Sequence, residues 1–116
     1  MKNPSYVYKA KIINVVDGDT VDAIIDLGFG VSFNTRLRLA GIDTMETNDK
    51  DAAKKALGLK AKERVKELLT NKEVTLQSFK EDKYGRYLAE IYVNDTQVNQ
   101  LLINEDLAVP YFGGTK

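Results

Sequence analysis

Acidic side chains follow directly after an apolar stretch that begins with an arginine. The segment RLAGIDTMETND (residues 38–49) starts at Arg38 and reaches a first carboxylate at Asp43. An earlier segment, DGDT (17–20), contains a second candidate carboxylate, Asp19. Carboxylate and carbonyl oxygens are the ligands that hard divalent cations such as calcium prefer. Asp19 and Asp43, together with a backbone carbonyl and water, are therefore a candidate cation site.

Other charged groups near these acids suit the hydrolysis of a phosphodiester. Glu46, three residues after Asp43, could take a proton from a water molecule bound to the cation. The planar guanidinium of Arg38 matches phosphate oxygens, and Arg86 in the segment DKYGR (82–86) offers a second such group. A cation, two arginines and a carboxylate base can stabilise the charge that gathers on phosphorus oxygens during the reaction.

Each of these segments also has a purely structural interpretation. DGDT is typical of a turn, DTMETND (43–49) is typical of a region that caps a helix, and Arg38 could be an ordinary solvent-facing strand residue. The chemical interpretation depends on the combination. Asp19 and Asp43 each lie at the boundary of a predicted strand, and two such strand ends can meet at one rim of a small barrel.

Composition narrows the chemistry further. The 116 residues include no cysteine and no histidine, so any metal must be held by oxygen, as calcium, magnesium and manganese are. The 17 basic and 17 acidic residues cancel, and the whole molecule exerts little long-range attraction on a polyanion. The segment from Lys50 to Glu67 contains seven cationic and three anionic side chains, and we interpret this excess of positive charge as a solvated helix face. Because the chain shows neither a secretion signal nor a membrane-spanning run, we expect a cytoplasmic protein that does not bind membranes.

The apolar pattern predicts the elements that must position the charged groups. Alternation and β-branched residues predict strands, with a hairpin break at Gly28 and Gly30. The strands are expected over residues 6–16, 20–27, 31–40, 73–79 and 87–93. Helical spacing predicts one long helix over 52–69, capped by Asn48 or Asp49, in which Gly58 weakens the helix without ending it.

A second, short helix is expected after a turn at Asp95 and Thr96. The length fits a single domain over residues 1–116. Five strands that include one hairpin and are interrupted by a helix suit an α+β, mainly β fold: a five-stranded OB-fold barrel with one long and one short helix. Periodicity alone leaves another α+β sheet open.

Four segments together resemble the staphylococcal (micrococcal) nuclease family, the thermonuclease-like domains. They are VVDGDT (15–20), RLAGIDTMET (38–47), DKYGR (82–86) and LAVPY (107–111), and the resemblance covers about residues 8 to 112. It implies an OB-type barrel and a calcium-dependent phosphodiesterase, an endonuclease that hydrolyses DNA and RNA and leaves 3′-phosphate ends. The short form without a secretion signal is similar to nucleases carried by phages.

The resemblance also implies roles for individual residues. Asp19 and Asp43 would be carboxylate ligands of Ca²⁺, and Thr44 would contribute its backbone carbonyl. Glu46 would be the general base that activates or orders the attacking water.

Further roles concern the substrate. Arg38 and Arg86 would clamp the phosphate and stabilise the transition state, and Lys83 and Tyr84 would contact the phosphate. Tyr111 matches a family tyrosine that stacks on a base, although LAVPY is spaced a little differently. Because a metal and two arginines act on the backbone of the substrate, we expect low sequence specificity, and we expect a monomer.

Two departures from the family pattern keep an alternative open. Met45 stands where the family usually has proline, and the cation-rich segment after residue 50 matches poorly. The alternative is a catalytically inactive nucleic-acid-binding OB-fold module of the same family, which would be expected to lack some of the charged residues. All five are present, namely Asp19, Arg38, Asp43, Glu46 and Arg86, and this favours the enzyme. An unrelated sugar-binding barrel would need aromatic residues gathered on one face, whereas the tyrosines here are scattered.

Overall fold

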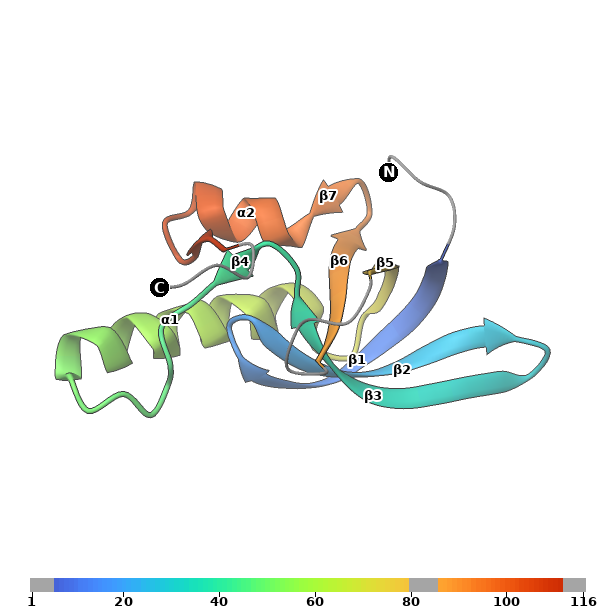
Figure 1. The fold of residues 1–116 in the computed structure, drawn as a ribbon, viewed down its shortest axis with the longest axis horizontal. Helices are drawn as coiled ribbons and strands as arrows, with labels where there is room; N and C mark the ends of the chain where they lie inside the picture. Colours follow the sequence, from blue (N-terminus) through green and yellow to red (C-terminus); the bar gives the residue numbers. More distant parts are fainter. Residues whose placement is uncertain (1–5, 80–85, 112–116) are drawn as a thin grey trace.

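Five long strands and two helices make up most of the structure. The computed structural model describes residues 6–79 and 86–111. The long strands are β1 (Val7–Asp17), β2 (Thr20–Gly28), β3 (Val31–Leu39), β5 (Glu73–Phe79) and β6 (Tyr87–Val93). The helices are α1 (Ala52–Leu69) and α2 (Val98–Asn104), and three two-residue strands complete the set: β4 (Ile42–Asp43), β7 (Thr96–Gln97) and β8 (Val109–Pro110) (Figure 1).

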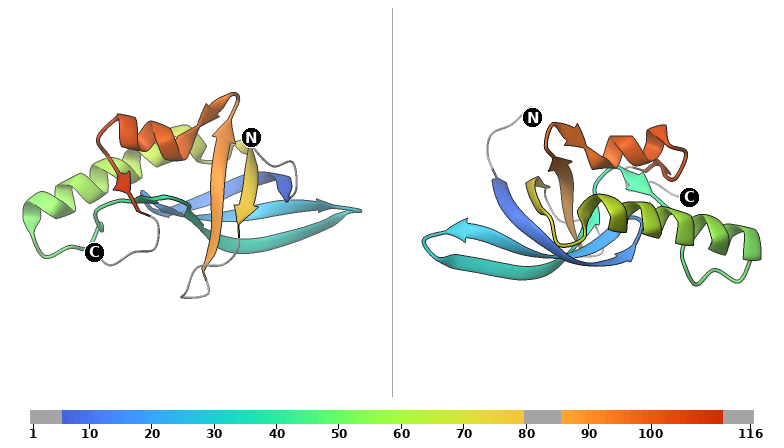
Figure 2. Two further views of the ribbon diagram at one scale, coloured as in Figure 1. Left: turned by 45° about the horizontal axis from the view of Figure 1, so that its top comes forward. Right: turned by 180° about the vertical axis from the view of Figure 1, so that it is seen from behind.

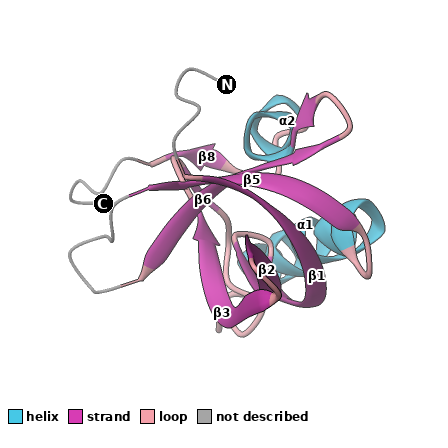
Figure 3. Cartoon of the chain, turned by 90° about the vertical axis from the view of Figure 1, so that its right-hand side faces the viewer, coloured by secondary structure: helices cyan, strands magenta, loops and turns pink. Residues whose placement is uncertain are grey.

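The long strands close into a barrel. Antiparallel pairing gives the order β3-β2-β1-β5-β6, with β7 added beyond β6. A parallel pairing of β3 with β6, in which Arg38 lies opposite Leu88, then joins the two ends of this order. Figure 3 shows the strands curving around one interior, with both helices outside it. The predicted fold class, a five-stranded OB-type barrel with one long and one short helix, is confirmed.

Alternating side chains from every long strand fill the barrel, and helix α1 covers one side of it. Ile12, Val21 and Leu76 are among the fully buried strand residues. Helix α1 packs against β1 and adds Val65 and Leu69 to the same core. The helix is therefore stabilised more by burial of apolar surface than by its intrinsic helix propensity. Its N-terminal end and the tip of the β2–β3 hairpin lie at opposite ends of the long axis of the molecule (Figures 1 and 2).

The predicted boundaries hold to within one or two residues for the long elements, but the predicted cap of α1 is wrong. Asp51 caps the helix, because its carboxylate accepts hydrogen bonds from the N–H groups of Ala53 (2.9 Å) and Lys54 (3.2 Å). The Asp49 carboxylate does not cap the helix but accepts a hydrogen bond from the N–H of Asp51 (2.8 Å). Neither helix of the described residues has the length and hydrophobicity of a transmembrane segment.

Candidate functional site

A polar pocket at one rim of the barrel gathers residues that lie far apart in the sequence. It is lined by Asp17, Asp19, Thr20, Arg38, Asp43, Thr44, Met45, Glu46, Arg86 and Tyr111. They come from the β1–β2 turn, the end of β3, β4 with its following loop, the residue before β6, and the segment after β8. Seven of the nine residues predicted for the site are in this lining. The other two, Lys83 and Tyr84, lie outside the described residues.

Asp19 connects the β1–β2 turn to two other segments of the pocket. Its backbone carbonyl accepts a hydrogen bond from the N–H of Leu39 (2.8 Å), and its Oδ2 accepts from the N–H of Thr44 (3.1 Å). Its Oδ1 accepts from the hydroxyl of Thr20 (3.0 Å). With only 8% of its surface exposed, Asp19 is held in one orientation by these bonds.

Arg38 is buried, so it is not an ordinary solvent-facing strand residue. Strand alternation directs Leu37 and Leu39 into the core and Arg38 to the opposite face, where 6% of it is exposed. Its Nη1 donates to the carbonyls of Ile42 (2.8 Å) and Leu39 (3.3 Å). These bonds fix the plane of the guanidinium group, and the ring of Tyr111 lies 5.2 Å from its central carbon, within the range of a cation–π contact.

The same guanidinium lies between the two candidate carboxylate ligands. Arg38 Nη2 is 3.0 Å from Asp43 Oδ1 and 3.5 Å from Asp19 Oδ2. These two oxygens can therefore be no more than 6.5 Å apart, the sum of the two distances. A calcium ion that binds oxygens at 2.3–2.6 Å needs two ligands within about 5 Å of each other. The measured distances are compatible with a shared ion.

The donor set around the carboxylates also fits a hard cation. The pocket offers carboxylate, hydroxyl and carbonyl oxygens, and Thr44 Oγ1 is buried there without a hydrogen-bond partner among the described residues. Within the described ranges, 6–79 and 86–111, no three acidic side chains lie close enough together to hold one metal ion by themselves. A cation at Asp19 and Asp43 would thus complete its coordination with carbonyl and water oxygens.

Glu46 lies in the pocket wall with its side chain exposed, and its backbone is fixed by two contacts. A Cβ atom on Gly58 of α1 would lie 2.6 Å from the Glu46 carbonyl oxygen, so only glycine allows the helix to approach the loop this closely. The hydroxyl of Thr47, the next residue, donates to Asp17 Oδ1 (2.8 Å) and connects the loop to the β1–β2 turn. Sequence reasoning missed both contacts. A glycine in a helix interior was the available signal for the first.

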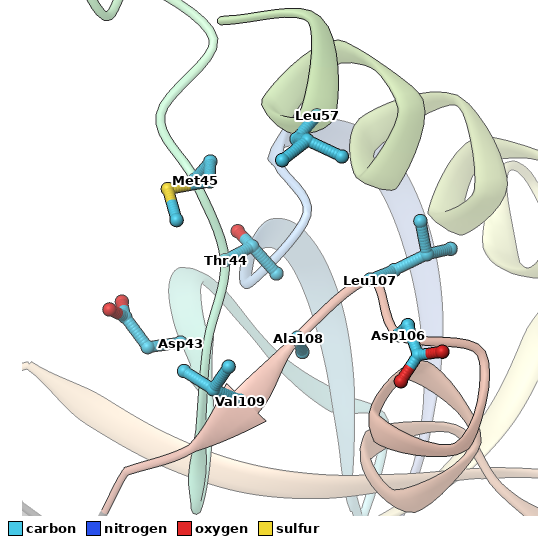
Figure 4. A pocket seen from close by; sticks show the side chains of 8 residues that line it. All are labelled: Asp43, Thr44, Met45, Leu57, Asp106, Leu107, Ala108 and Val109. Atoms are coloured by element: carbon cyan, nitrogen blue, oxygen red, sulfur yellow. The ribbon is translucent and has the colours of Figure 1, made fainter. Parts of the chain in front are cut away.

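A second, mostly apolar pocket lies beside the polar pocket. It is lined by Asp43, Thr44, Met45, Leu57, Asp106, Leu107, Ala108 and Val109. Figure 4 shows Leu57 projecting from α1 toward the segment that carries Thr44 and Met45, with Ala108 and Val109 on the neighbouring β8 segment. The loop that follows β4 thus has a polar pocket on one side and an apolar one on the other.

Comparisons with known proteins place the chain in one family. The family model described as "Staphylococcal nuclease homologue" matches residues 36–116. Thermonuclease of Staphylococcus hyicus is 38% identical over 100 residues, 84% of this chain and 56% of that protein. Thermonuclease of Staphylococcus intermedius is 37% identical over 110 residues, 93% of this chain and 60% of that protein. Endonuclease YncB of Bacillus subtilis (strain 168) is 33% identical over 110 residues, 92% of this chain and 50% of that protein.

The chain therefore spans between 50% and 60% of the length of these three relatives. The family model covers well over half of the 116 residues and includes the end of β3 and every later element, from β4 to β8 with both helices. This chain belongs to the family of staphylococcal nuclease homologues.

Proposed function

We propose that the chain is a calcium-dependent endonuclease that hydrolyses the phosphodiester bonds of DNA and RNA with low sequence specificity. The observation that carries this proposal is the convergence of two arginines and three acids on one polar pocket. They are Arg38, Arg86, Asp19, Asp43 and Glu46. The names of the relatives, thermonuclease and endonuclease, support the reaction class.

The cation would be held by three groups of the pocket. Asp19 and Asp43 would each supply a carboxylate oxygen, and Thr44 its backbone carbonyl. When bound, calcium would polarise a phosphoryl oxygen and make a nearby water molecule more acidic. Asp19 is already fixed for this role, because its hydrogen bonds to the Thr44 and Thr20 groups set the direction of its carboxylate before any ion arrives.

Glu46 would accept the proton of the attacking water. Its exposed side chain lies at the wall of the pocket and is free of the ion pairs that hold Asp19 and Asp43 to Arg38. Its position relative to those carboxylates depends on the close approach of Gly58 and on the Thr47 hydrogen bond to the β1–β2 turn. Such fixed placement of a base brings the reacting groups together before the reaction and lowers its entropic cost.

Arg38 and Arg86 would stabilise the negative charge that builds on the phosphate. Arg38 is buried and already oriented by two backbone carbonyls, so little reorganisation is needed during the reaction. Arg86 is exposed and lines the same pocket, and Lys83 and Tyr84 of its segment would contact the phosphate as well. Tyr111, whose ring lies beside Arg38, would stack on an adjacent base.

The proposal is tested with a supercoiled plasmid and a labelled RNA, each incubated with the protein in calcium, in magnesium and in chelator. We expect cleavage of both substrates in calcium only, with 3′-phosphate ends. Glu46→Gln should reduce the rate at least 100-fold, whereas Glu73→Gln, which removes an exposed acid outside the pocket, should not. Cleavage that continues in chelator would exclude the metal-dependent mechanism. Binding of both nucleic acids without cleavage would instead identify an inactive binding module.

A further inference from the structure

A second groove adjoins the polar pocket at the seam where β3 pairs with β6. It is lined by Thr20, Thr35, Arg36, Arg38, Arg86 and Tyr87, and we call it the seam groove. Thr20, Arg38 and Arg86 line the polar pocket too, so the two depressions share a wall. A ligand that reaches Arg38 and Arg86 from the polar pocket can therefore continue into the seam groove.

Two exposed aromatic rings stand at this seam. Tyr87 is 41% exposed, although its backbone pairs with that of the buried Leu37, and Phe33 is 42% exposed. Their ring centroids are 6.0 Å apart and their planes are inclined by 74°, an edge-to-face arrangement. This is a favourable geometry for an aromatic pair, and it leaves part of each ring open to solvent.

Arg36 adds a planar cation whose orientation is also fixed. Its Nε lies 2.8 Å from Asp22 Oδ1 and its Nη2 lies 3.4 Å from Asp22 Oδ2, a two-point contact. This contact raises the pKa of Arg36 and lowers the pKa of Asp22, while 62% of the Arg36 side chain stays exposed. The pair orients a guanidinium plane at the groove without removing it from solvent.

We propose that the seam groove binds unstacked bases of single-stranded nucleic acid next to the phosphate held by Arg38 and Arg86. Aromatic rings and guanidinium planes are the surfaces on which proteins stack unpaired bases, and such stacking tolerates any base. Tyr87 and Arg86 both line the seam groove, so the Tyr87 ring can take a base on this side of the phosphate, while Tyr111 lies in the polar pocket. This inference rests on the proposed function and adds to it a base-binding subsite, the seam groove, beside the pocket that would hold the phosphate.

The inference is tested by measuring the binding of oligonucleotides in chelator, where the proposed nuclease is inactive. Fluorescence anisotropy compares a labelled oligothymidine with an oligonucleotide of equal length whose sugars carry no bases. Wild type should bind the oligothymidine about tenfold more tightly than the abasic strand. Tyr87→Ala should lose most of this difference and leave binding of the abasic strand unchanged, whereas Tyr87→Phe, which keeps the ring, should behave as wild type.

The matched control is Phe29→Ala, which removes a fully exposed aromatic ring from the tip of the β2–β3 hairpin, outside the groove. It should bind both strands as wild type does, and melting curves should show that every variant is folded. Equal binding of both strands by wild type, or unchanged discrimination in Tyr87→Ala, would overturn the inference. If the protein binds the oligothymidine more tightly than the abasic strand but cuts neither DNA nor RNA in calcium, the proposed nuclease activity is wrong and the base-binding role of the seam groove stands.

Discussion

Gly58 of α1 lies directly against the backbone of Glu46, which is the candidate base. A Cβ atom at position 58 would be 2.6 Å from the Glu46 carbonyl oxygen and 2.8 Å from that of Met45, closer than real side chains approach. A glycine in a helix interior costs about 1 kcal/mol relative to alanine. Here that cost allows the helix to support the loop at the wall of the polar pocket.

Gly58→Ala should lower the cleavage rate at least tenfold, because the added methyl group must push the Glu46 loop away from the pocket, and displacements of about 1 Å are enough to impair catalysis. Lys60→Ala, an exposed site on the same helix, is the control. Initial rates on a labelled oligonucleotide, together with thermal melting, measure the effect. A Gly58→Ala protein that is both more stable and fully active would contradict the role assigned to this contact.

Alanine at either arginine should reduce turnover by about 100-fold, but only one change should damage the fold. Arg38 is buried between two acids, and its removal takes away the cation that lies between Asp19 and Asp43, a loss of about 3 kcal/mol. Arg86 is exposed, so Arg86→Ala should lose much less stability in urea denaturation than Arg38→Ala does. Wild-type rates in either variant, or equal losses of stability in both, would be inconsistent with this arrangement.

Calcium should stabilise the folded chain, since the two carboxylates adjoin only when the barrel is formed. At one hundred times its dissociation constant a ligand contributes about 2.7 kcal/mol, which corresponds to a rise in melting temperature of roughly 10 °C for a chain of this size. The rise should vanish in Asp19→Asn and Asp43→Asn. It should persist in Asp95→Asn, an exposed acid outside the pocket. A similar rise in all four proteins would show that the ion binds elsewhere.

Met45→Pro should stabilise the protein and preserve its activity. Among the described residues the Met45 N–H donates no hydrogen bond that proline would remove, and Thr44 before it follows the extended strand β4. A compatible proline stabilises by about 0.4–1 kcal/mol, chiefly by restricting the unfolded chain. Urea denaturation of Met45→Pro beside Met45→Ala separates this effect from loss of the methionine side chain. Destabilisation by proline alone would mean that the loop has a different backbone conformation from that of other family members.

Much of the fold could be predicted from the sequence, because long strands and the long helix carry clear periodic patterns. The short strands β4, β7 and β8 could not, since two residues define no period. The cap of α1 was misassigned because several acidic and amide residues precede the helix, and their hydrogen bonds with one another decide which one is the cap.

For the candidate site, too, some features could be predicted from the sequence and others could not. Asp19, Arg38 and Asp43 follow from short segments with characteristic spacing, and the structure brings both carboxylates within ion-pair distance of Arg38. The support of Glu46 by Gly58 depends on how a helix docks on a loop, which no local pattern encodes. The seam groove likewise depends on the pairing of β3 with β6, between residues remote in sequence.

That pairing has a consequence for the order of folding. Leu37 and Tyr87, which face each other across the seam, are fifty positions apart in the chain, and forming such a contact requires a large loop to be closed first. A nascent or half-unfolded polypeptide would carry every acid and arginine named above and yet be unable to cut nucleic acid. Hydrolytic competence should thus appear only once the barrel has closed at this seam and be lost when the seam opens.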